Sequence, residues 1–216
     1  MDFELTPEQE EFRKIVRAFA EEVVAPRAEA MDRAEELDPD VLDQMAGMGL
    51  FGLPFPEDVG GMGADYLTLC LAVEELARVD SSVAITLEAA VSLGAMPIWR
   101  FGDGEQHRRW LRPLAAGERL AAFGLTEPGG GSDAGSLRTR ATLDGDEWVI
   151  DGTKAFITNA GLDRSGLVTV AAVTGERPDG RGEITTIIVP AGTPGYRVGR
   201  KYRKVGWHAS DTRELV

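Results

Sequence analysis

The sequence predicts an α+β protein in which an N-terminal all-α helical domain, residues 1–118, precedes a compact antiparallel β domain, residues 119–216. Three observations support this prediction. Apolar side chains recur at helical spacing over the first part of the chain. From Glu118 onward, short strand-like runs and glycine turns replace that spacing. The 216 residues are 43% hydrophobic, which is enough to build a sizeable core.

The first helix is expected to begin at Thr6-Pro7. Thr6 is a good N-cap, and Pro7 suits the first helical position because the N–H that it lacks has no helical partner there. Gln9 can close a capping box back onto Thr6. The apolar side chains that follow fall on one face at helical spacing: Phe12, Ile15, Val16, Phe19 and Val23.

Further helices are expected in the rest of this domain. One begins at Asp38-Pro39-Asp40. The others run from about Asp65 to Ala77, from Val83 to Met96 and from Glu105 to Leu111. The Gly- and Pro-rich segment Leu53–Gly63 predicts an ordered loop. The helix from Val83 is nearly apolar, so we expect it to be buried on most sides. Pro97 should break or kink it.

Eight later segments have the composition of strands. They are Leu120–Thr126, Leu137–Leu143, Glu147–Ile150, Lys154–Thr158, Leu167–Val173, Ile184–Val189, Tyr196–Val198 and Arg213–Val216. Asp144-Gly145 is typical of a hairpin turn, and Asp151-Gly152 is a second turn signal. The polar segment Thr174–Gly182 predicts an exposed loop.

Composition limits the function classes. The net charge of −13 repels nucleic-acid phosphates and anionic membrane surfaces, although a local basic pocket can still bind an anionic ester. The single cysteine, Cys70, excludes an internal disulfide, and two histidines in different segments argue against a metal site. The N-terminus is acidic, and we find no apolar run of the roughly 18 residues that span a membrane. We therefore expect a soluble cytoplasmic protein without nucleic-acid or membrane partners.

The segment Phe123–Asp133 is the most informative part of the chain. It joins a short apolar strand to a Thr-Glu-Pro turn, three glycines, Ser132 and Asp133. Adjacent glycines allow a sharp turn and a close approach to backbone N–H groups, a property of phosphate and cofactor sites. A glycine cluster alone is more often an ordinary flexible turn.

A second informative segment runs from Asp151 to Ala160. Its turn leads into a short strand in which Phe156 and Thr158 should share one face, because strand side chains alternate in direction. An aromatic ring beside a hydroxyl can pack on a planar ring and bond to its polar edge. Taken alone, the same pattern also describes an ordinary half-buried strand.

Together these segments resemble the acyl-CoA dehydrogenase family of flavoenzymes, which has Leu-Thr-Glu-Pro-x-x-Gly-Ser-Asp and Gly-x-Lys-x-(Trp/Phe)-Ile-Thr-Asn motifs. The matching stretches are 125–133 and 152–159, and Lys204–Thr212 is similar to the family's later Gly-x-x-x-Ser-Asp-Thr stretch. The resemblance covers essentially the whole chain. Two departures are mild: Gly130 replaces the commoner alanine, and Phe156 the commoner tryptophan.

The resemblance implies FAD as the cofactor. It assigns the flavin's pyrimidine edge to the backbone of Leu125 and to Thr126, and the region where the cofactor pyrophosphate and CoA approach each other to Ser132. Phe156 would pack against the isoalloxazine, and Thr158 would bond near N5. The resemblance also implies an acyl pocket floored by residues of the apolar helix, namely Leu87, Glu88, Ala89 and Val91. The absence of arginine before Arg100 in this helix weighs against a dicarboxyl-CoA substrate.

The carboxylates of the motifs are interpreted as structural. Glu127 is tempting as a base, but the family does not use it so, and we expect it to stabilise the turn. Asp133 and Asp211 are likewise expected to stabilise turns. His208 lies either near the mouth of the site or, the preferred interpretation, solvated at a strand end.

The reaction implied is α,β-dehydrogenation of an acyl-CoA thioester to a trans-2-enoyl-CoA, in fatty acid metabolism. The resemblance suggests electron-transferring flavoprotein as acceptor and a homotetramer or dimer. It also implies that a C-terminal helical bundle, absent from this chain, carries the catalytic glutamate, so no catalytic residue is expected here and the β domain stops before its end. The alternatives are a flavin-dependent oxidase or monooxygenase of the same family, and a non-catalytic flavin- or CoA-binding fragment.

Overall fold

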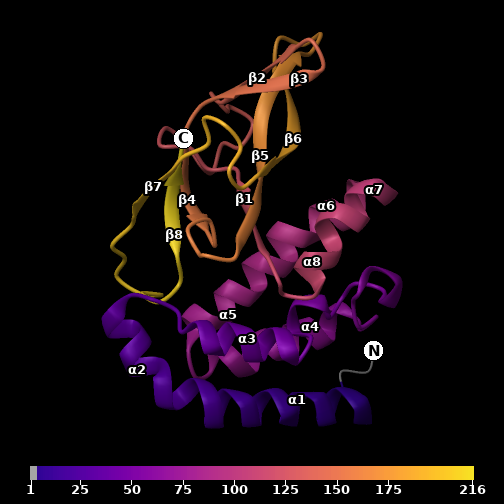
Figure 1. Cartoon of the computed structure of the whole chain (residues 1–216), viewed down its shortest axis with the longest axis vertical. Helices are drawn as coiled ribbons and strands as arrows, with labels where there is room; N and C mark the ends of the chain where they lie inside the picture. Colours follow the sequence, from indigo (N-terminus) through magenta and orange to yellow (C-terminus); the bar gives the residue numbers. More distant parts are fainter. Residues whose placement is uncertain (1–3) are drawn as a thin grey trace. The chain divides into compact units, whose positions relative to one another are not determined.

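The computed structural model describes residues 4–216 and divides the chain into two compact units. The first contains the residues up to Arg119 together with Arg203–Asp211, and the second contains Leu120–Tyr202 with Thr212–Val216. The first is built from helices and the second from strands (Figure 1). The predicted order of a helical region followed by a β region is confirmed.

The first unit contains α1 (Pro7–Phe19), α2 (Ala25–Ala34), α3 (Pro39–Gly47), α4 (Tyr66–Ala77), α5 (Ser81–Glu88), α6 (Met96–Phe101), α7 (Gly104–Gln106) and α8 (Arg112–Ala115). Three π-helical segments join neighbouring helices into longer runs, at Ala20–Val24, Ala89–Ala95 and His107–Leu111. Two short 3₁₀ turns, Leu50–Gly52 and Glu57–Val59, lie between α3 and α4.

The helix starts agree with the expected capping chemistry. The Thr6 hydroxyl accepts a hydrogen bond from the Gln9 N–H at 3.2 Å, and the Gln9 side chain accepts one from the Thr6 N–H at 3.0 Å, which completes the predicted capping box. The carboxylates of Asp38, Asp65 and Asp80 accept from backbone N–H groups in the first turns of α3, α4 and α5. These side chains supply partners for N–H groups that a helix leaves unpaired.

Two helical runs pass through a proline: the helix expected to break or kink at Pro97 continues to Phe101, and the last helix continues past Leu111 to Ala115. Pro97 and Pro113 each lie in the first turn of an α segment that directly follows a π-helical segment. A π turn shifts the backbone hydrogen-bond pattern, so it can accommodate a residue that has no N–H to donate. The helical run from Ser81 therefore continues through Pro97 to Phe101.

The run Ser81–Phe101 corrects one expectation from the sequence. This helical run of 21 residues is long and apolar enough, by length and composition, to cross a membrane. The expectation that no apolar run reaches this length was therefore wrong. In the folded chain, 61% of its most apolar window is buried. This burial is that of a core helix, and α5 also packs against α4.

The second unit contains two sheets. The larger joins β1 (Leu120–Gly124), β2 (Arg140–Asp144), β3 (Glu147–Asp151), β5 (Ser165–Glu176) and β6 (Gly182–Pro190). The smaller has the order β4 (Lys154–Thr158), β8 (Thr212–Leu215), β7 (Val198–Lys201). Figure 1 shows the long β5 as the strand shared by β1, β2 and β6.

The expectation of a purely antiparallel β domain was wrong in one respect. β5 pairs antiparallel with β6 but parallel with both β1 and β2. Parallel neighbours need a crossover of a dozen or more residues, and the stretch from Leu125 to Arg164, with its hairpin and β4, provides one between β1 and β5.

The two turns of the larger sheet differ in how well they were predicted. Gly145 lies in the β2–β3 hairpin at φ 66°, a left-handed conformation that glycine adopts without cost, as expected for Asp-Gly. The loop predicted at Thr174–Gly182 is shorter, because Glu176 pairs with Gly182 and extends the β5–β6 ladder. The polar composition of this segment reflects its exposed position on a hairpin end.

Glu75 is a buried carboxylate that joins α4 to α1. Arg17 donates two hydrogen bonds to it, at 2.9 and 2.6 Å, and Arg78 donates one at 3.3 Å. The hydrogen bonds from Arg17 are the main reason that the pKa of Glu75 is lowered. We expect Glu75→Gln to lower the free energy of unfolding by about 1–3 kcal/mol, because charged hydrogen bonds are lost at a buried site.

Urea denaturation at neutral pH measures this change. The matched control is Glu21→Gln, since Glu21 pairs with Arg78 on the surface and its loss should cost less than about 1 kcal/mol. Equal effects of the two substitutions would contradict a special role for the buried carboxylate.

Candidate functional site

Two of the predicted motifs are joined by hydrogen bonds at the start of β4. The Ala155 N–H donates to the Thr126 carbonyl at 2.8 Å. The Lys154 ammonium donates to the Leu125 carbonyl at 3.1 Å. The loop that follows β1 is therefore fixed against β4, and the two motifs form one local structure.

A buried ion pair lies at the centre of this structure. Lys154 Nζ is 2.9 Å from a Glu127 carboxylate oxygen, and the two residues are only 2% and 7% exposed. The same carboxylate accepts hydrogen bonds from the backbone N–H groups of Arg138 at 2.7 Å and Thr139 at 2.9 Å. Each of these three hydrogen bonds to the Glu127 carboxylate comes from a group that favours its ionised form.

These contacts decide the ionisation of Glu127. Burial raises its pKa, but the hydrogen bonds from Lys154, Thr139 and Arg138 together outweigh burial and lower the pKa to about 2. A carboxylate with this pKa is ionised at neutral pH and a weak base. The interpretation of Glu127 as a structural residue is confirmed by its contacts.

The glycine loop is a tight turn with an exposed tip. Glu127 and Gly130 exchange two backbone hydrogen bonds, at 3.0 and 3.1 Å, around Pro128 and Gly129. Gly130, Gly131 and Ser132 beyond this turn are exposed. Asp133 accepts a hydrogen bond from the Ser136 hydroxyl at 2.7 Å, so its expected role in stabilising a turn is confirmed.

Phe156 lies in a β-bulge. Lys154 pairs with Leu215 and Ile157 with Arg213, so two residues of β4 lie opposite one residue of β8. The backbone of β4 bulges to accommodate its extra residue, and Phe156 within the bulge has φ 61°. This left-handed conformation is costly for a residue with a bulky side chain, and such strain is found preferentially at functional sites.

The bulge directs the Phe156 ring outward. Phe156 is 61% exposed, while its neighbours Ala155 and Ile157 are buried and Thr158 is partly buried. The ring packs against Tyr202, with centroids 4.6 Å apart and planes tilted by 35°. An exposed aromatic ring and a partly accessible hydroxyl therefore occur two residues apart on β4, where the bulge interrupts the regular alternation of side chains.

The helix residues assigned to the acyl pocket lie in the first unit. Leu87, Ala89 and Val91 are buried, and Glu88 is partly exposed. Glu88 directly precedes the π-helical segment that starts at Ala89. π-helical segments often mark functional sites, because they shift side chains out of the regular helical pattern.

The third motif forms a tethered segment of the first unit. Lys204 donates a hydrogen bond to the Ser210 carbonyl at 2.5 Å. His208 contacts the Asp32 carboxylate at 2.8 Å through Nδ1 and the Lys204 carbonyl at 2.9 Å through Nε2. The expectation that His208 is a solvated imidazole at a strand end was wrong, because both ring nitrogens face acceptors in the same unit. Asp211 is buried at the end of this segment.

Sequence reasoning missed two residues of this site. Lys154 lies within the motif 152–159 but has no predicted role, although a lysine in a strand with the apolar residues Ala155 and Ile157 signals a buried cation that needs a partner. Tyr202 gave no signal, because its contact with Phe156 depends on the pairing of β8 with both β4 and β7.

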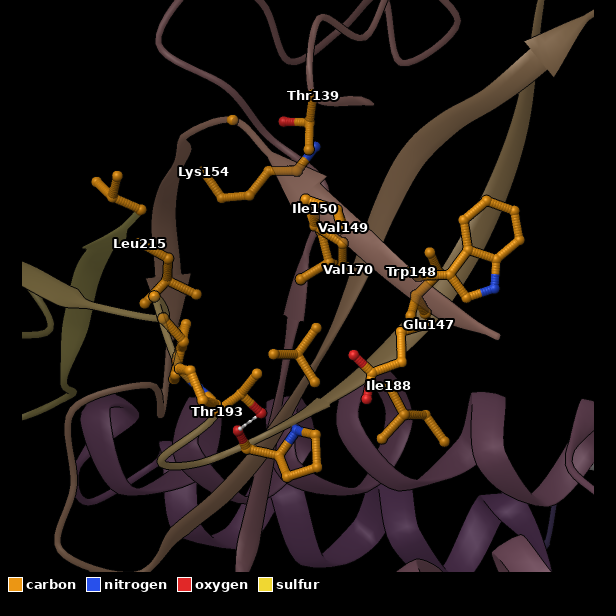
Figure 2. A pocket seen from close by; sticks show the side chains of 18 residues that line it. Thr139, Glu147, Trp148, Val149, Ile150, Lys154, Val170, Ile188, Thr193 and Leu215 are labelled. Atoms are coloured by element: carbon orange, nitrogen blue, oxygen red, sulfur yellow. Dashed lines mark hydrogen bonds between the residues drawn. The ribbon is translucent and has the colours of Figure 1, made fainter. Parts of the chain in front are cut away.

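The pocket in Figure 2 is a separate feature of the second unit. Its volume is about 620 Å³, and apolar side chains of several strands, among them Ile150, Val170 and Leu215, line it. Lys154 and Thr139 lie at one end (Figure 2). The positions predicted to bind the cofactor do not line this pocket.

Comparison with known proteins gives two family matches. Residues 6–118 match the model of the acyl-CoA dehydrogenase N-terminal domain, and residues 122–216 match that of the middle domain. A probable acyl-CoA dehydrogenase of Bacillus subtilis is 46% identical over 216 residues, which is 100% of this chain and 56% of that protein. The chain thus spans little more than half the length of this relative.

Solved structures agree with these matches. The butyryl-CoA dehydrogenase of Megasphaera elsdenii has a TM-score of 0.93 and 43% identity over 100% of this chain and 57% of its own. A chain in a structure of the electron transferring flavoprotein of Acidaminococcus fermentans has a TM-score of 0.94 and 43% identity, covering 100% and 56%. An acyl-CoA dehydrogenase from Bacillus anthracis, complexed with FAD, has a TM-score of 0.88 and 32% identity, covering 99% and 36%.

The ion pair predicts a specific pH dependence of stability. The pKa of Glu127 is about 2 in the folded chain, against an ordinary value of 4.5. A lowered folded-state pKa gives stability that is fully present above pH 4.5 and is lost as the pH falls toward 2. The loss should reach about 3 kcal/mol.

Urea denaturation of the wild type and of Glu127→Gln between pH 7 and pH 2 isolates this contribution, because the other carboxylates are common to both. We expect the difference between their free energies of unfolding to shrink below pH 4.5. A difference that stays constant down to pH 2 would contradict the assignment.

Replacement of Lys154 by an uncharged residue should destabilise the fold more than the loss of a surface lysine does. Lys154→Met leaves Glu127 buried without its charged partner, so we expect a loss of about 3–5 kcal/mol in the free energy of unfolding. Lys14→Met is the control, because Lys14 forms a solvent-exposed pair with Glu11. The control should change stability by less than about 0.5 kcal/mol. Similar values for the two lysines would show that the buried pair is unimportant.

Proposed function

This chain belongs to the acyl-CoA dehydrogenase family, and we propose that the protein catalyses FAD-dependent α,β-dehydrogenation of an acyl-CoA thioester to a trans-2-enoyl-CoA. One observation carries the proposal. The glycine loop and the strained, exposed Phe156 are held in one local structure by the buried pair of Glu127 and Lys154. An ordinary turn and an ordinary strand need neither the buried charges nor the strain.

The residues present fit a flavin. Phe156 offers an exposed aromatic face, and Thr158 on the same strand offers a partly accessible hydroxyl. The backbone of Leu125, the side chain of Thr126 and the exposed Ser132 would hold the polar parts of FAD. When bound, FAD supplies the hydride acceptor of the reaction.

We assign no catalytic base to the described residues of this chain. Glu127 is the buried carboxylate within the motifs that are joined at β4, and its low pKa and three donors argue against a role in proton abstraction. We propose that a glutamate outside these 216 residues removes the α-proton. The greater length of the relatives supports this assignment.

The substrate is proposed to be a short acyl-CoA, since one similar structure is a butyryl-CoA dehydrogenase. Ser132, Leu87, Glu88, Ala89 and Val91 are the proposed substrate contacts. Electron-transferring flavoprotein is the proposed acceptor, and a chain matched within an electron transferring flavoprotein structure supports it.

Three expectations from the sequence remain predictions. We propose domains at residues 1–118 and 119–216, and the two family matches, which end at 118 and begin at 122, support this division. A homotetramer or dimer and a cytoplasmic location rest on the sequence alone. Light scattering and cell fractionation test them.

Anaerobic visible spectroscopy of the purified protein tests the function. Bleaching of the oxidised flavin band by butyryl-CoA or by another ester of a chain-length series would support dehydrogenation. Flavin that binds but survives every ester would support the alternative of a binding fragment. Rapid reoxidation by air with release of peroxide would support an oxidase instead.

A hydroxyl substitution tests the cofactor contact. Thr126→Val keeps the size of the side chain but removes its hydrogen-bonding group, so we expect FAD to bind about 2- to 10-fold more weakly. Fluorescence titration of FAD measures the affinity. The control is Thr142→Val on the exposed strand β2, which should bind FAD as the wild type does. Equal affinities of the two variants would remove Thr126 from the site.

A further inference from the structure

We infer that Tyr202 is a positioning residue for the cofactor site: it holds the ring of Phe156 in one orientation, so that Phe156 presents a fixed face to the flavin. The inference deepens the proposed function and rests on it. It adds a residue outside the motifs that carry the family resemblance. Its basis is the contact of the Tyr202 ring with Phe156 on β4 and with Arg200 on β7.

The Phe156 ring needs support from outside its own strand. Its backbone is fixed in a left-handed conformation by the bulge, but its side chain points away from the core and is 61% exposed. An exposed aromatic side chain that lacks packing partners changes rotamer on a short timescale. A ring that must lie flat against a ligand loses affinity through that freedom, because binding has to restrict it.

Tyr202 supplies this support. Its ring lies 4.6 Å from the Phe156 ring, within the range of favourable aromatic pairs. Its backbone N–H donates to the Thr212 carbonyl at 3.0 Å, and Thr212 in turn pairs with Thr158 of β4. The supporting ring and the supported ring are thus both anchored to β8.

Arg200 makes a second contact with the Tyr202 ring. Its guanidinium lies 5.2 Å from the centroid of the Tyr202 ring, a geometry typical of a cation–π contact. Tyr202 therefore contacts both Phe156 and Arg200. Because Tyr202 covers only part of the Phe156 ring, a large exposed area of that ring stays open to a planar ligand.

The contact between Tyr202 and Phe156 also bears on a departure noted in the sequence. Phenylalanine at position 156 has a smaller ring than the commoner tryptophan, and a smaller ring has fewer contacts to hold it. Tyr202 lies beside this smaller ring and provides aromatic contact from a second strand region. If Tyr202 served folding alone, its removal would change stability but not the binding of FAD. If it positions Phe156, its removal must change the affinity for FAD and the environment of the bound flavin.

The experiment compares Tyr202→Ala, Tyr202→Phe and Arg200→Gln in the protein that contains this chain. FAD affinity is measured by fluorescence titration, and the environment of bound FAD by visible circular dichroism. We expect Tyr202→Ala to bind FAD about 2- to 10-fold more weakly and to change the visible dichroism. Tyr202→Phe keeps the ring and should restore both, and Arg200→Gln should have a smaller effect in the same direction.

A second readout does not depend on the cofactor. In the FAD-free protein with labelled phenylalanine, the order parameter of the Phe156 ring carbons should fall in Tyr202→Ala and remain in Tyr202→Phe. Phe101→Ala is the control, because Phe101 is 89% exposed and its removal should change neither readout. Thermal melting of each variant identifies any general loss of folding.

The outcomes separate the inference from the proposed function. Wild-type affinity and an unchanged Phe156 order parameter in Tyr202→Ala would overturn the inference while the flavin site stands. Tyr202→Phe behaving as Tyr202→Ala would also overturn it, because the ring would then not be the supporting group. A wild type that binds no FAD would overturn the proposed function, and the order parameter would still decide whether Tyr202 orients Phe156.

Discussion

The buried pair of Glu127 and Lys154 is the interaction on which the local structure of the second unit depends. The carboxylate binds the backbone of the segment that precedes β2, and the ammonium binds the backbone that follows β1. Lys154 itself is the first residue of β4. One ion pair therefore fixes three chain segments that are distant in sequence. Transfer of both charges out of water is costly, so the pair is better explained by the geometry that it enforces than by net stability.

The strain at Phe156 follows from this arrangement. The ion pair fixes one end of β4, and the ladder with β8 fixes Ile157 and Thr158, so the extra residue between them must bulge. A bulge turns a side chain away from the regular alternation of the strand, and here it exposes an aromatic ring. The surrounding hydrogen bonds outweigh the local cost of the left-handed backbone. Tyr202 then limits the motion of the exposed ring.

The helical unit uses buried charge for a similar purpose. Glu75 of α4 is buried, and its hydrogen bonds from Arg17 fix α4 against α1. In both units a buried carboxylate receives donors from separate elements and has a lowered pKa. The units differ in what the carboxylate organises: two packed helices in one, and a loop and a strand that carry polar and aromatic ligand groups in the other.

The sequence by itself determined the order of helices and strands, the helix caps and the composition of the motifs, because these depend on neighbouring residues. The Thr6 capping box, the Asp144-Gly145 hairpin and the bounds of β4 were predicted for that reason. The tertiary structure decided what depends on residues distant in sequence. The parallel pairing of β1 with β5 and the contact of His208 with Asp32 are of this kind. The sequence named Glu127 as structural, but only the fold brought it to Lys154, since a buried charge finds its partner through tertiary packing.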